Sequence, residues 1–140
     1  MKRYCNECRV QLGYFQNIPA DFNFTGSEYL LDKFLKHILP VECNDKISIF
    51  NDKNYKQYKE YIVNANLSGS IEVLDNNNVN ILLIVENEIG QLYLDGTKAP
   101  IIQDTIKVVL SNNLLRIHAF PTSSNELKNY SCENCQKNIF

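Results

Sequence analysis

The amino-acid sequence predicts an α+β fold, in which an antiparallel sheet packs with two or three helices. Two observations support this class: residues 25–39 carry an apolar stripe with helical spacing, and several short apolar runs separated by turn residues are typical of strands. No Pro- or Gly-rich linker divides the 140 residues. We therefore expect residues 1–140 to form a single domain with its α+β body at 11–130.

The clearest predicted helix covers residues 25–39. Thr25 and Glu28 fit a capping box, or Ser27 is the cap itself, and Pro40 ends the helix. Six apolar side chains recur along one stripe and are expected in the core: Leu30, Leu31, Phe34, Leu35, Ile38 and Leu39.

Two further segments have helical features. Residues 52–62 place Tyr55, Tyr58 and Ile62 on one side of a second predicted helix. Residues 101–111 fit both structures, since their β-branched content favours a strand whereas a polar stripe and the preceding proline favour a helix. We expect a helix there.

Short apolar runs bounded by turn residues predict the strands. The central three are expected to form an antiparallel meander, because only short turn-rich segments separate them. A polar loop at 122–131 follows the last strand. The predicted strands are 9–15, 46–50, 70–75, 79–86, 90–95 and 114–120.

The cysteines carry the most specific chemical signal. Cys5 and Cys8 form one C-x-x-C turn, and Cys132 and Cys135 form a second near the other end of the chain. Each turn supplies two thiolates, and zinc binds four ligands in a tetrahedron. The spacing predicts one structural Zn²⁺ in a zinc-ribbon-like cluster, with knuckles at 4–10 and 131–137 that join the two ends of the chain.

Other uses of these cysteines stay open. Two disulfides would suit an oxidising compartment, but the N-terminal MKRYCNEC has no apolar segment of an export signal behind it. A redox C-x-x-C would be expected between an apolar strand and a helix, and the sequence around neither turn predicts that setting. An iron site of rubredoxin type would be expected to have glycine after the second cysteine, where Arg9 and Gln136 stand.

The remaining candidate residues have simpler structural roles. Cys43 lies outside both turns and is expected to be an inert thiol. His37 near a helix C-terminus and His118 on a strand are expected to be structural, and Glu86 and Glu88 to lie in a solvated turn. The sequence has none of the common nucleotide, protease or hydrolase motifs, so no catalytic residue is predicted.

Charge is distributed unevenly. Residues 60–104 hold seven acidic residues and one basic residue, and the acidic side chains considered for a surface are Glu72, Asp75, Glu86, Glu88 and Asp95. Such a surface would attract a basic partner. The two cysteine turns carry a small basic and aromatic group that suggests nucleic-acid binding instead: Lys2, Arg3, Tyr4, Arg9, Lys128, Tyr130 and Lys137.

These observations predict a small, non-enzymatic cytoplasmic binding protein with a structural zinc and a protein partner, comparable in type to an immunity protein or an inhibitor. The first alternative is a zinc-ribbon nucleic-acid-binding protein. The second is a small enzyme whose site the sequence does not show. No apolar run reaches the roughly 20 residues that cross a membrane, so no membrane partner is expected.

Overall fold

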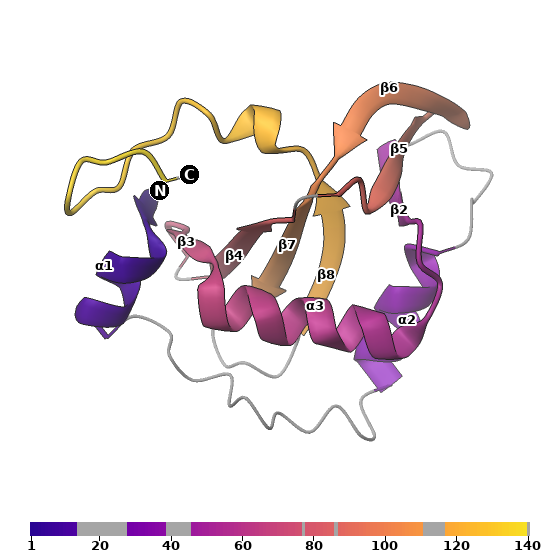
Figure 1. Ribbon diagram of the computed structural model, residues 1–140. Coiled ribbons are helices and arrows are strands. Elements are labelled where there is room, and N and C mark those ends of the chain that lie inside the picture. The colour runs from indigo at the N-terminus through magenta and orange to yellow at the C-terminus, as the bar shows by residue number, and fades with distance from the viewer. Residues whose placement is uncertain (14–27, 39–45, 77, 86, 111–116, 140) are drawn as a thin grey trace.

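Two antiparallel sheets and three α-helices make up the part of the chain that the computed structural model describes, which is residues 1–13, 28–38, 46–76, 78–85, 87–110 and 117–139 (Figure 1). The α+β class is confirmed. The larger sheet has the strand order β1-β3-β4-β7-β8, with β1 at Lys2–Tyr4, β3 at Ser70–Val73, β4 at Val79–Ile84, β7 at Thr105–Leu110 and β8 at Ile117–Thr122. The smaller has the order β2-β5-β6, with β2 at Lys46–Phe50, β5 at Gly90–Leu94 and β6 at Thr97–Gln103.

One face of the larger sheet is covered by α3 (Tyr55–Ser68), as Figure 1 shows. The Asn54 side chain caps this helix by accepting a hydrogen bond from the amide of Lys56 at 3.0 Å. The buried side of α3 carries Tyr58, Ile62 and Ala65.

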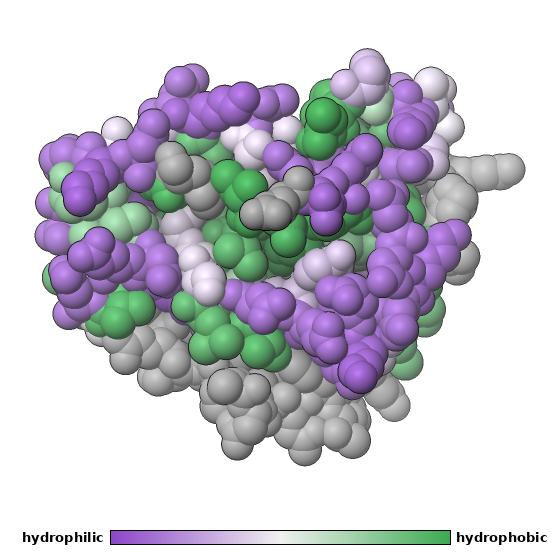
Figure 2. Space-filling model, viewed as in Figure 1, coloured by the Kyte–Doolittle hydropathy of each residue, from purple (hydrophilic) through white to green (hydrophobic). Residues whose placement is uncertain are grey.

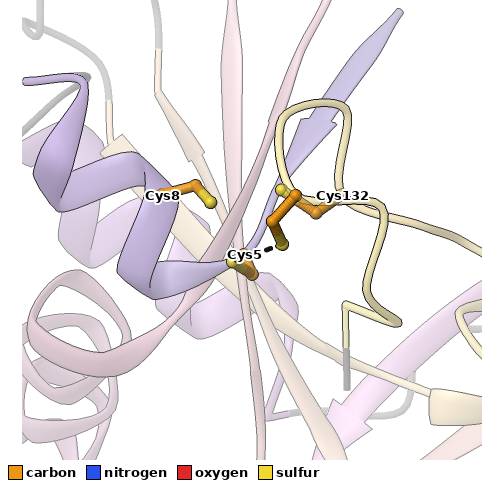
Figure 3. Close-up of side chains that lie close together, drawn as sticks. Cys5, Cys8 and Cys132 are labelled. Atoms are coloured by element: carbon orange, nitrogen blue, oxygen red, sulfur yellow. Dashed lines mark hydrogen bonds between the residues drawn. The ribbon is translucent and has the colours of Figure 1, made fainter.

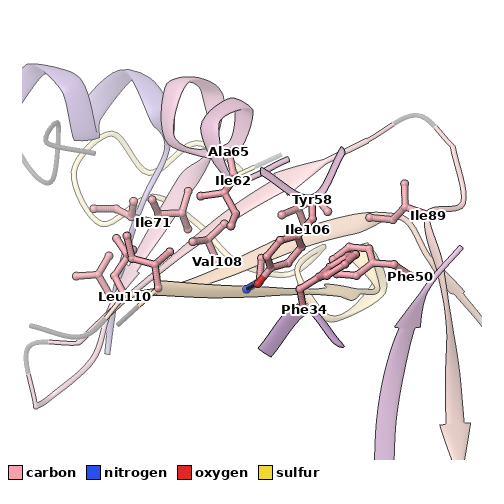
Figure 4. Packing of buried hydrophobic residues seen from close by; sticks show 14 of the residues in the cluster. Phe34, Phe50, Tyr58, Ile62, Ala65, Ile71, Ile89, Ile106, Val108 and Leu110 are labelled. Carbon is pink, nitrogen blue, oxygen red and sulfur yellow. Dashed lines mark hydrogen bonds between the residues drawn. The ribbon is translucent and has the colours of Figure 1, made fainter. Parts of the chain in front are cut away.

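The main core lies between α3 and the larger sheet (Figure 4). Ile62 and Ala65 of α3 have no exposed surface, and neither do Ile71, Ile81 and Val108 on the strands beneath them. On the outward side of α3, hydrophilic side chains predominate, whereas hydrophobic side chains gather in the hollow between α3 and the C-terminal segment (Figure 2).

The first predicted helix is present as α2 (Glu28–Lys36), but its apolar stripe is only partly buried. Phe34 and Ile38 are core residues, as expected, whereas Leu31 and Leu35 are 42% and 43% exposed. The expectation that the whole stripe is core was therefore wrong for these two residues. The reason is that α2 packs at the β8 edge of the larger sheet and against α3, so only part of its surface is covered. The side chain of Leu30, and Leu39 as a whole, lie outside the described residues.

Of the segment 101–111, in which we expected a helix, residues 101–110 are not helical, and residue 111 lies outside the described residues. Residues 101–110 form the end of β6 and then β7, separated by Asp104. In β7, buried Ile106 and Val108 alternate with half-buried Lys107 and Val109, and this strand pairs with β4 and β8 along its whole length. Pairing on both sides favours the β-branched side chains that the sequence analysis had noted, and it outweighs the helical polar stripe.

Two other expectations about strands were wrong. The chain does not form a meander from β3 to β5, because β4 pairs with β7 and β5 pairs with β2 and β6 in the smaller sheet. Residues 9–11 belong to the helix α1 (Asn6–Gln11) rather than to a strand, and residues 14 and 15 of that predicted strand lie outside the described residues. Within the described part of the chain, none of the helices is both long and apolar enough to cross a membrane.

Candidate metal centre

The four cysteines come together from opposite ends of the chain. Cys5 follows β1 and precedes α1, and Cys8 lies within α1. Cys132 and Cys135 lie in a turn closed by an antiparallel bridge between Ser131 and Asn138. Figure 3 shows Cys8 projecting from α1 toward Cys5 and toward the loop that carries Cys132.

The geometry of the sulfur atoms fits a tetrahedral metal ion. All four Sγ atoms lie within 4.8 Å of one another, and those of Cys5 and Cys135 are 3.9 Å apart. A tetrahedron with Zn–S bonds of about 2.3 Å has sulfur–sulfur separations of about 3.8 Å. The four cysteines are free thiols, not disulfides. They can therefore hold one metal ion.

The surroundings of Cys8 and Cys132 shift the pKa values of these two thiols in opposite directions. Burial alone would raise the pKa of Cys132, but hydrogen bonds from the backbone of Cys135, Cys5 and Asn134 outweigh it and lower that pKa to about 6. At Cys8 the Asn134 side chain, 3.4 Å from Sγ, lowers the pKa, but burial and the neighbouring thiols outweigh it and raise the value to about 12. A bound divalent cation would lower the pKa of both of these thiols, because its charge stabilises all four thiolates.

The structure around the cluster joins the two ends of the chain. The amide of Glu133 donates a 2.7 Å hydrogen bond to the carbonyl of Arg3, in β1. The Arg3 guanidinium lies 3.5 Å from the centre of the Tyr130 ring and donates a 3.0 Å hydrogen bond to the buried carboxylate of Glu72. Its position opposite Glu72 in the β1–β3 register explains this pair. The predicted association of the two ends is therefore present before any metal is considered.

Arg9 anchors α1 to the rest of the fold. Its side chain is 1% exposed and donates hydrogen bonds to the carbonyl of Gly69 at 3.1 Å and to the amide oxygen of Asn66 at 2.8 Å. Gly69 is the C-terminal cap of α3, where helix carbonyls need donors and a positive charge is favourable. The sequence analysis had placed Arg9 in a basic surface group, and this was wrong.

The two halves of the cluster do not form a pair of matching knuckles. The second half is a tight turn, in which Gln136 adopts φ of 64° and donates a hydrogen bond to the carbonyl of Cys132. The first half is the start of a helix. The four cysteines come together as expected, but the local structure at Cys5 and Cys8 differs from the expected one, because α1 replaces the strand expected after the first turn.

The acidic residues of the middle segment do not gather into one surface. Glu72 is 5% exposed and paired with Arg3. Asp75 follows β3 in the larger sheet and Asp95 follows β5 in the smaller, and these turns lie at opposite ends of the molecule in Figure 1. Glu88 is exposed, as expected for a turn, whereas Glu86 and Cys43 lie outside the described residues.

The two histidines lie together, which their separate treatment in the sequence did not predict. His37 and His118 both stack near Phe120, with ring centres 5.5 and 6.0 Å from it, and both line one cavity. Strand alternation places His118 and Phe120 on the same face of β8, and this was visible in the sequence. The approach of His37 was not, because it depends on how α2 packs against β8.

No family model, curated protein or solved structure matches this chain.

Proposed function

We propose that the protein is a small, non-enzymatic binding protein in which one structural zinc ion joins the two ends of the chain. The convergence of four thiols within 4.8 Å supports the metal. Four protein ligands leave no coordination position for a substrate, so a zinc ion held here would be structural. Thiolate ligands must be reduced, so we propose a reducing compartment such as the cytoplasm.

A test of the metal needs its identity and its stoichiometry. Native mass spectrometry of protein purified without added metal is expected to show one zinc ion per chain, and elemental analysis should distinguish zinc from iron. A folded protein that carries four free thiols and no metal would contradict the proposal.

For the partner, we propose a protein, comparable in type to an immunity protein or an inhibitor. The observation that favours a protein over a nucleic acid is the use of Arg3 and Arg9 inside the fold, where Arg9 is buried and Arg3 pairs with Glu72. Among the five basic residues considered for nucleic-acid binding, this leaves three exposed lysines, which is a weak electrostatic surface. Their positions are Lys2, Lys128 and Lys137.

A feature of the smaller sheet also supports a protein partner. One of its two outer strands, β6, has no neighbouring strand on its outer side among the described residues, and the β5–β6 hairpin exposes Leu94 and Ile102 at 43% and 60%. Unpaired strand edges and exposed apolar side chains are common in protein–protein contacts. An apolar contact of this kind does not depend on the acidic surface that the sequence suggested.

The two classes of partner differ in their dependence on salt. Binding to generic double-stranded DNA and to single-stranded RNA should be negligible at physiological ionic strength. Binding to a purified protein partner, found by cross-linking to the zinc-loaded protein, should weaken in Ile102→Lys and stay unchanged in the exposed control Lys128→Gln. Tight nucleic-acid binding with a steep salt dependence would overturn the proposal in favour of the nucleic-acid alternative.

A further inference from the structure

A cavity of about 460 Å³ lies between the two sheets, and none of the four cysteines lines it. The larger sheet contributes Lys107 and the β8 residues His118, Phe120 and Thr122. The smaller sheet contributes residues of β2, β5 and β6. His37, the residue after the end of α2, also lines the cavity. The volume is within the range of small-molecule sites, which is about 300–1,000 Å³.

The charges around this cavity have one sign. Lys46 and Lys107 line it together with the two histidines, and no carboxylate is present among its described lining residues. The nearest acid along the chain, Asp104, accepts hydrogen bonds from the amide and hydroxyl of Ser124 at 2.8 and 2.7 Å. Ser48, Thr122 and Ser123 also line the cavity, and each carries a hydroxyl group that can act as a neutral donor.

His37 is held in one orientation. Its Nδ1 lies 2.8 Å from the carbonyl oxygen of Ser48, which can only accept, so Nδ1 carries a proton and donates it. The ring also stacks on Phe120. A second proton, on Nε2, would give the ring a positive charge and a hydrogen-bond donor on each nitrogen, which suits an anionic ligand.

The surroundings disfavour protonation of both imidazoles in the absence of an anion. Burial, followed by the charges of Lys33 and His37, lowers the pKa of His118 to about 4. Burial also lowers the pKa of His37; the hydrogen bond to Ser48 opposes this, and the charges of Lys33 and Lys36 add to it. A bound anion would favour the protonated forms and reverse these effects.

The other part of the cavity wall is apolar. Leu92, Ile101, Phe120 and Pro121 line it, with Ile47 beside them. This wall gives an organic group a surface to pack against, whereas inorganic phosphate would contact only the polar part.

We propose that the cavity between the two sheets binds a small organic phosphate, with the phosphate at Lys46, Lys107 and the two histidines and the organic group against Leu92, Ile101 and Phe120. Two lysine charges match the charge of about −2 that a phosphate monoester carries near neutral pH. The histidines and hydroxyls supply further donors to its oxygens. The site is separate from the zinc centre, so it can be tested independently of the proposed function.

Isothermal titration calorimetry with phenyl phosphate, inorganic phosphate and phenol tests the two parts of the site. Phenyl phosphate should bind, inorganic phosphate should bind more weakly, and phenol should show no binding at the same concentrations. Repeating the phenyl phosphate titration at pH 7 in buffers of different ionisation enthalpy should show proton uptake by the protein. Equal affinity for phenyl phosphate and phosphate would overturn the organic part, and equal affinity for phenyl phosphate and phenol would overturn the anionic part.

Variants locate the site. Lys107→Gln should weaken phenyl phosphate binding about tenfold or more, because it removes a charged hydrogen-bond donor. Lys98→Gln is the matched control, since Lys98 is an exposed lysine of β6 that does not line the cavity. If Lys107→Gln fails to fold, Lys46→Gln at an exposed position gives the same readout. Unchanged binding in folded variants, or no binding of phenyl phosphate by the unaltered protein, would overturn the proposal.

Discussion

Replacing Tyr58 by phenylalanine should destabilise the protein although only one oxygen atom is lost. The Tyr58 side chain is 1% exposed, and its hydroxyl accepts a 2.9 Å hydrogen bond from the buried amide of Ala119 in β8. Because β8 is the last strand of the larger sheet in the described part of the chain, no further strand described there can replace this acceptor. The tyrosine ring itself packs between Phe34 and Phe50, with centres 4.9 and 5.7 Å away, and phenylalanine would keep that packing.

The expected cost follows from leaving one buried N–H group unsatisfied. Such a group costs about 1–3 kcal/mol. For a domain of this size, that corresponds to a fall in the melting temperature of roughly 4–10 °C.

Chemical denaturation measures this cost directly, with Tyr61→Phe as the control. Tyr61 lies one turn further along α3, is half-buried and stacks on Phe50 at 5.8 Å, so the same substitution there should cost less than about 0.5 kcal/mol. Hydrogen exchange should also show faster exchange of the Ala119 amide in Tyr58→Phe. A loss below about 0.5 kcal/mol, together with unchanged exchange at Ala119, would refute the reasoning.

Three further predictions concern the core, the sheets and the metal. Phe34→Ala should cost about 3–5 kcal/mol in denaturation experiments, because the ring is 3% exposed and a cavity would remain; a cost below about 1 kcal/mol would show that α2 does not depend on it. Gly90→Ala should cost about 1–3 kcal/mol, since a Cβ atom would lie 2.5 Å from Cγ of Pro121, and an unchanged melting temperature would contradict this approach of β5 to β8. Cys132→Ser should abolish zinc binding measured by native mass spectrometry, whereas Cys43→Ser should keep it; loss of zinc in Cys43→Ser would show that the ligands were assigned wrongly.

The sequence predicted most of the secondary structure and the grouping of the four cysteines, because both follow from local sequence patterns. The strand at Lys46–Phe50 was predicted with its observed ends, and the four cysteines were paired by their spacing. The alternation that places His118 and Phe120 on one face of β8 was also visible. Local pattern predicts the type of an element better than its partners.

Apart from the two segments whose type was predicted wrongly, at 101–110 and 9–11, the errors concern pairing and packing, which local pattern does not determine. The turn residues on either side predict a strand at 90–95, but they do not say that this strand pairs with β2 in a second sheet. The burial of Glu72 depends on Arg3, its partner across the β1–β3 register and 69 residues away. For the same reason the cavity was missed, since strands from both sheets and His37, which follows α2, line it. Each of the two histidines also had a sufficient structural explanation in the sequence.

The contact between the C-terminal segment and β1 also bears on how the protein would aggregate. Strand β1 is an outer strand of the larger sheet, and its Arg3 carbonyl is covered by the amide of Glu133, next to Cys132 of the proposed metal centre. Exposed strand edges are templates on which other chains assemble. If the metal holds this cover in place, its removal by a chelator exposes a strand edge while the core under α3 stays folded. Metal-depleted protein would then accumulate as aggregates of nearly native chains, and its loss from solution would depend on protein concentration as well as on temperature.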